Sequence, residues 1–93
     1  MSKYLEEHEK KLSATVARAS QKPEVVAILR QHGKHPDDVR AIYEELLRAG
    51  AGYYVAEMVI QSPALLAEYF AMKESDTSEE RIAFTLLKRV RGY

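Results

Sequence analysis

His32 and His35 stand at the H-x-x-H spacing, and Asp37 and Asp38 follow, so these four side chains could together bind a metal ion. A metal site needs imidazole nitrogens and carboxylate oxygens that converge on one point. A second interpretation places His32 in the last turn of a helix, where its charged form is favourable, and His35 at a helix cap. Because helix ends account for both histidines, we expect no cofactor. A metal- or ligand-binding helical domain at His32 and His35 stays as an alternative hypothesis.

Glu57 and Glu68 form a second candidate pair, because two facing carboxylates can perform general acid–base catalysis. The chain contains no G-x-S-x-G motif and no glycine-rich phosphate loop that would accompany them. It also lacks cysteine, which excludes thiolate nucleophiles, thiolate metal ligands and disulfides. The polar stripes of two helices explain both glutamates, so we expect that the protein is not an enzyme.

The C-terminal segment is basic. Its cations are Arg81, Lys88, Arg89 and Arg91. Such groups contact phosphates in nucleic-acid-binding proteins, but cations in the last turn of a helix also complement the helix dipole. The whole chain has 14 Lys+Arg, 14 Asp+Glu and a formal net charge of zero, which disfavours nucleic acid as the main partner. A nucleic-acid-associated helical regulator is therefore an alternative hypothesis.

The stretch 49–72 carries only two charged residues, Glu57 and Glu68. A helical hairpin of such low charge forms either the core or an interface, and a chain of 93 residues has few layers in which to bury it. The chain has six Tyr and no Trp, and tyrosine suits interfaces. We predict a non-enzymatic protein-interaction or regulatory module that binds itself or another protein, most simply as a homodimer through this hairpin. The predicted interface residues are Tyr53, Tyr54, Met58, Leu65 and Tyr69.

Proline and glycine mark the helices that must position these residues. Prolines precede three apolar runs and glycines follow two, the asymmetry typical of helix starts and ends. Ser62 reads as a helix N-cap, and Thr77 with Glu80 reads as a capping box. The pattern predicts helices over residues 3–20, 23–32, 36–49, 52–61, 63–73 and 78–91.

The expected fold is all-α, a compact orthogonal or antiparallel bundle of five to six short helices in a single domain spanning residues 1–93. Apolar positions at helical spacing predict the core. The expected core residues are Leu12, Val16, Val26, Leu29, Val39, Ile42, Leu46, Val55, Val59, Leu66, Phe70, Ile82, Leu86 and Leu87.

The composition, with 46% hydrophobic residues, is that of an ordinary globular protein. The N-terminal residues lack the apolar run of a secretory signal. No window reaches the roughly 20 uncharged apolar residues that a membrane span needs. We therefore expect a cytoplasmic protein that does not enter a membrane.

Overall fold

The computed structural model describes the backbone of residues 3–92 and, within them, every side chain except those of residues 3–5 and 8. All regular structure in this range is helical. The elements are α1 (Lys3–Gln21), α2 (Pro23–Gln31), a 3₁₀ turn η1 (Pro36–Asp38), α3 (Val39–Arg48), α4 (Tyr53–Gln61), α5 (Pro63–Glu74) and α6 (Glu79–Arg91). The predicted all-α bundle of short helices is confirmed.

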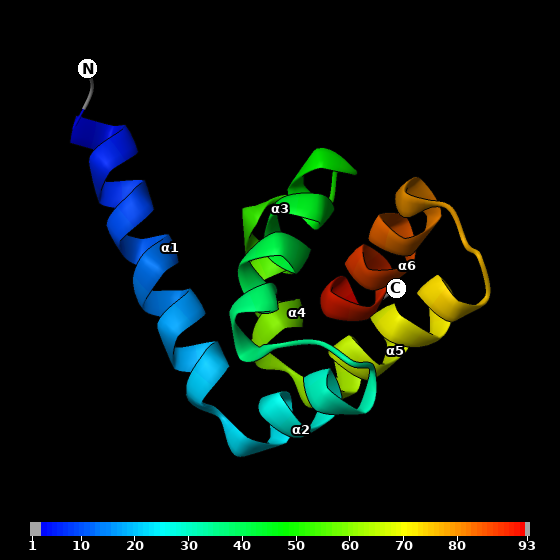
Figure 1. The fold of residues 1–93 in the computed structure, drawn as a ribbon. Helices are drawn as coiled ribbons and strands as arrows, with labels where there is room; N and C mark the ends of the chain where they lie inside the picture. The colour runs from blue at the N-terminus through cyan, green and yellow to red at the C-terminus, as the bar shows by residue number, and fades with distance from the viewer. Residues whose placement is uncertain (1–2, 93) are drawn as a thin grey trace.

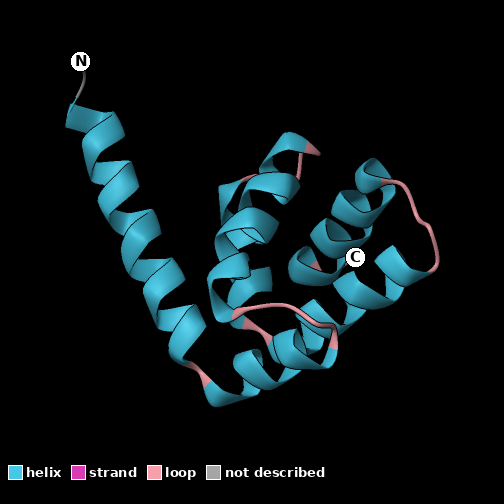
Figure 2. Cartoon of the chain, viewed as in Figure 1, coloured by secondary structure: helices cyan, strands magenta, loops and turns pink. Residues whose placement is uncertain are grey.

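Helix α4 lies at the centre of the bundle, where it packs against α1, α3, α5 and α6. Helix α1 runs along one flank, and its amino-terminal turns extend beyond the other helices (Figure 1). The helices are joined by short loops (Figure 2). Within residues 3–92, none of the helices has the length and apolar character that a membrane crossing requires.

The joint between α3 and α4 is a tight, hydrogen-bonded turn. The amide of Ala51 donates to the Leu46 carbonyl at 3.0 Å, and the amide of Gly50 donates to the Leu47 carbonyl at 3.1 Å. This Schellman pattern requires a left-handed residue after the helix, and Gly50 supplies it with φ of 98°. Ala51 is itself buried next to the core. The turn therefore fixes where α4 begins.

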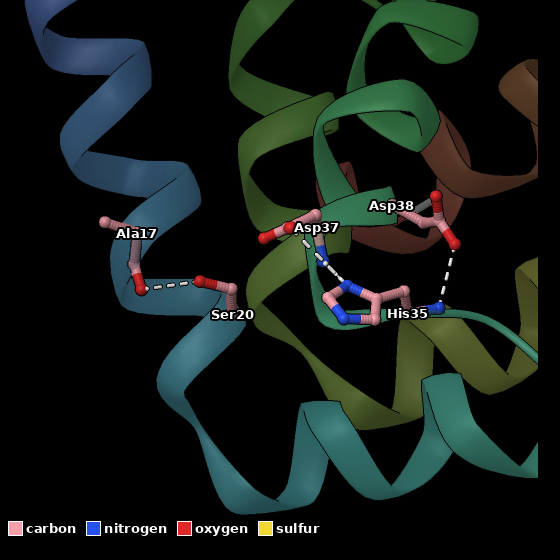
Figure 3. Close-up of polar contacts among 5 residues, drawn as sticks. All are labelled: Ala17, Ser20, His35, Asp37 and Asp38. Carbon is pink, nitrogen blue, oxygen red and sulfur yellow. Dashed lines mark hydrogen bonds and ion pairs between the residues drawn. The ribbon is translucent and has the colours of Figure 1, made fainter.

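The start of α3 differs from the prediction of one continuous helix over 36–49. The Nδ1 atom of His35 accepts from the Asp37 amide at 3.2 Å, and Oδ2 of Asp38 accepts from the His35 amide at 2.8 Å (Figure 3). This reciprocal capping box closes a 3₁₀ turn, and the α-helix starts only at Val39. The same view shows the last turn of α1, where the Ser20 hydroxyl donates to the Ala17 carbonyl at 3.0 Å (Figure 3).

Of the two other predicted N-caps, the one of α5 is confirmed and the one of α6 is wrong by one residue. Ser62 caps α5 as expected, because its Oγ accepts from the Leu65 amide at 3.2 Å. The cap of α6 is Ser78 and not Thr77, since the Oγ of Ser78 accepts from the Arg81 amide at 3.3 Å. The hydroxyl of Ser78, one residue after the predicted Thr77, therefore accepts the hydrogen bond from the first turn of α6.

The predicted core is buried except at three positions. Val16, Val26 and Leu87 are only partly covered, because each lies at the edge of its helix's buried stripe. On α2 the inward row is instead Val25 and Leu29. The core further contains Ala19, Tyr43, Ala51, Ala56, Ile60, Tyr69 and Ala83, together with the buried polar residue Thr15. Small alanines let helices approach closely, which the apolar pattern alone does not predict.

Candidate interaction surfaces

Helix α4 carries three large exposed side chains, of which Tyr53, the first residue of the helix, projects about 100° away from Tyr54. Tyr53 is 54% exposed, Tyr54 is 63% exposed and Met58 is 39% exposed. We call these three residues the α4 face. Tyr54 and Met58 are four residues apart, so they are neighbours on one side of the helix. The side of α4 opposite Tyr54 and Met58 is buried, and this burial directs these two side chains outward, whereas Tyr53 is exposed at the start of the helix.

Leu65 and Tyr69, the two other predicted interface residues, lie elsewhere. Leu65 is partly buried against the core. Tyr69 is only 4% exposed, and its ring makes an edge-to-face contact with Phe70 at 5.1 Å between centroids. The structure therefore places Tyr69 inside the bundle, and the surface expected from the 49–72 hairpin is reduced mainly to its first helix.

A polar network explains why Tyr69 is turned inward. Its hydroxyl donates to Oε2 of Glu45 on α3, and Nζ of Lys73 lies 2.6 Å from the other carboxylate oxygen. Burial by itself would raise the pKa of Glu45, but the hydrogen bonds from Lys73 and Tyr69 outweigh it and hold this pKa below its ordinary value. Burial, and then the bond to Glu45, raises the pKa of Tyr69 far above the usual range. The network joins α3 to α5.

Tyr43 also lies in the core, but unlike Tyr69 its hydroxyl makes no hydrogen bond to a described residue. The side chain is fully buried. Burial raises the pKa of Tyr43 to about 12, and Glu57, Tyr53 and Glu9 act in the same direction. A buried hydroxyl without a partner costs free energy, so Tyr43 is a weak point of the fold.

The outward side of α6 combines cations with an aromatic ring. Phe84 is 59% exposed, and Nζ of Lys88 lies 5.3 Å from its ring centroid. Arg81 and Arg91 precede and follow these two residues on the same side of the helix. We call Arg81, Phe84, Lys88 and Arg91 the α6 face. A depression of about 650 Å³ is lined by three of these residues, Arg81, Phe84 and Lys88.

Three of the four predicted nucleic-acid residues therefore share the α6 face, and the fourth does not. Nε of Arg89 binds Oε1 of Glu68 on α5 at 2.8 Å, so its charge is already paired, although the side chain is exposed and lines the same depression. Sequence reasoning missed Phe84. Its position three residues after Arg81 and four before Lys88 is the signal that could have revealed it.

The two histidines have separate surroundings. The His32 ring stacks on Phe70 at 4.3 Å between centroids, and its Nδ1 lies 2.8 Å from Oε1 of Glu74. His35 is exposed, and its Nδ1 is engaged by the Asp37 amide (Figure 3). Among the side chains that the structure describes, no group of three or more His, Asp or Glu residues could hold a metal ion. Both histidines take part in helix-end contacts.

The two glutamates considered for catalysis also have different neighbours. The carboxylate of Glu68 pairs with Arg89, whereas Glu57 lies on α4, where its charge acts on Tyr43. A groove of about 450 Å³ between α3 and α5 is lined by neither of them. It contains the His32–Phe70 stack and the Glu45–Lys73 pair. Its residues His32, Glu45, Tyr69, Lys73 and Glu74 are used in contacts between helices.

The chain was compared with models of protein families, with curated proteins and with solved structures, and none of them matches it.

Proposed function

We propose that the protein is a non-enzymatic interaction module that associates with a second copy of itself through the α4 face. The observation that carries the proposal is the exposure of Tyr54 and Met58 side by side on a helix whose other side is buried. Together with Tyr53 they make up three of the four large hydrophobic side chains that are exposed among the described residues. Adjacent apolar side chains of this kind mark contact surfaces.

The charges on α4 favour a second copy as the occupant. The helix has a single charged residue, Glu57, and no lysine or arginine. Two α4 helices related by a twofold axis would thus bring together aromatic rings and methionines with little like-charge repulsion. An acidic or basic partner would find almost no complementary charge there. The low charge of α4 therefore favours a second copy of the chain as the binding partner.

The surroundings of α4 support such a contact in a second way. Four helices pack against it, and the Schellman turn at Gly50 fixes its beginning. A surface on a rigid helix loses little conformational entropy when it binds. The face is nevertheless only one side of a nine-residue helix, which is small beside the roughly 800 Å² per partner of a stable interface. We therefore expect a reversible, concentration-dependent dimer.

The test is the mass in solution across a wide range of concentrations. For the natural chain, we expect the mass to rise from 10.6 kDa toward twice that value as the concentration increases. Tyr54→Glu should keep the protein monomeric, because a charge buried in the contact without a partner is costly. The substitution lies in the first turn of α4, where the helix dipole tolerates an acid, so folding is preserved.

The matched control is Ala67→Glu, which places the same charge on an exposed position of α5. It should leave the association unchanged. If the natural chain keeps a mass of 10.6 kDa at every concentration, or if both variants weaken association equally, the proposal is wrong.

A further inference from the structure

We propose that the α6 face is a second contact surface, which binds an acidic segment of a partner protein with Phe84 as its apolar anchor. The observation behind the proposal is a phenylalanine that is largely exposed in the middle of a line of cations. Aromatic residues and arginine are both enriched where proteins bind one another. This surface is separate from the α4 face and does not depend on self-association.

Helix geometry puts the four residues of the α6 face in one stripe. At about 100° per residue, positions 81, 84, 88 and 91 fall within an arc of about 80°. The buried residues Ile82, Ala83 and Leu86 occupy the opposite side. The stripe is about 15 Å long, which matches two to three turns of a helical peptide or a short extended one. Caps at Ser78 and Gly92 define both ends of α6, so the surface is preformed.

The charge of the stripe identifies the chemistry of the partner. Among the described side chains, Arg89 has an ion pair with Glu68, whereas none joins Arg81, Lys88 or Arg91 to an acid. These three cations remain accessible for carboxylates of a partner. The ammonium of Lys88 also lies over the Phe84 ring, and this arrangement offers an apolar surface and a positive charge at one place.

An acidic peptide fits the α6 face better than nucleic acid does. Glu79 and Glu80 begin the same helix, and Glu80 lines the depression, so the negative charges of a ligand must meet the three cations and stay clear of Glu80. A nucleic acid carries a phosphate at every nucleotide and cannot leave one out beside Glu80, whereas a peptide carries carboxylates only at some of its positions. An acidic segment with one central apolar residue, by contrast, can cover Phe84 and direct its carboxylates toward the three cations.

The experiment measures binding of a fluorescein-labelled helical peptide of Glu and Leu residues by fluorescence anisotropy at about 50 mM salt. A peptide with Gln in place of Glu serves as the uncharged control. We expect the acidic peptide to bind and the Gln peptide to bind at least about tenfold more weakly. Binding should fall steeply when the salt is raised to about 0.5 M, because exposed charges are then screened.

Two variants locate the site, and two controls separate this proposal from self-association. Phe84→Ala and Arg81→Glu should each weaken binding about tenfold, the first through lost apolar contact and the second through charge reversal. Lys11→Glu, an exposed charge reversal on α1, should change nothing. Tyr54→Glu should bind the peptide normally, and Phe84→Ala should retain the concentration-dependent mass of the natural chain.

Three results would overturn the proposal. The first is no binding of the acidic peptide at any concentration up to about 1 mM. The second is binding that neither Phe84→Ala nor Arg81→Glu weakens, since the peptide would then lie elsewhere. The third is binding of a single-stranded oligothymidine without binding of the peptide, which would assign the face to nucleic acid.

Discussion

Replacing tyrosine by phenylalanine should have opposite effects on the stability of this protein at Tyr43 and at Tyr69. Both rings are buried, and each substitution removes one hydroxyl group. At Tyr69 the hydroxyl donates to the carboxylate of Glu45, whereas at Tyr43 it has no partner among the described residues. The chemical change is the same, so the difference isolates hydrogen bonding.

The magnitudes follow from the two surroundings. A hydrogen bond to a charged group contributes about 1.5–3 kcal/mol, and Lys73, which is partly exposed, still pairs with the Glu45 carboxylate when the tyrosine hydroxyl is removed. We expect Tyr69→Phe to lower the free energy of unfolding by about 1–2 kcal/mol. Tyr43→Phe removes a buried hydroxyl that costs free energy, and we expect a gain of about 1 kcal/mol.

Urea unfolding at pH 7, followed by circular dichroism, measures both values. With an m-value of about 1 kcal/mol/M, the midpoints of the two variants should differ by about 2–3 M urea, with the natural chain between them. If Tyr43→Phe is the more destabilising of the two, or if the variants do not differ, the assignment of the two hydroxyls is refuted.

The remaining predictions concern single residues. Asp76 has a left-handed φ of 63° after α5, so Asp76→Gly should raise the melting temperature by about 4 °C, and Asp76→Asn should give a smaller gain by removing only the unfavourable charge. Ser62→Ala should cost about 1 kcal/mol in urea unfolding because the Leu65 amide loses its cap, and Ser62→Asp should not. The pKa of Glu45 is lower in the folded state than its ordinary value of 4.5. The ionised carboxylate therefore contributes fully to the free energy of unfolding above pH 4.5, and this contribution is lost as the pH falls below 4.5. Glu45→Gln should therefore flatten the acid-side loss of stability, and an unchanged profile would contradict the role of Glu45.

Helix positions could be read from the sequence because their signals are local. Gly50 and Pro63 act on the residues next to them, and the helices they delimit begin or end within one or two residues of the predicted points. The 3₁₀ turn before α3 was missed because the His35–Asp38 capping box competes with a continuous helix. Such competition depends on side-chain geometry, which a pattern of residue types does not contain.

The candidate surfaces could be predicted only in part, because exposure depends on contacts distant in the sequence. Tyr54 and Tyr69 belong to the same low-charge hairpin, but only Tyr69 meets an acceptor, Glu45, which lies 24 residues away. Burial of α4 by four helices likewise decides that Tyr54, and not the valines of the same helix, faces outward. Composition located the hairpin, and tertiary packing selected which part of it remains accessible.

The central claim, that the α4 face binds a second copy, is tested most directly by a dilution series of amide NMR spectra. On dilution we expect shift changes concentrated at residues 53–58, whereas the spectrum of Tyr54→Glu should not change with concentration. Spectra that do not change with concentration, or changes that fall on other helices and leave residues 53–58 unaffected, would contradict the claim.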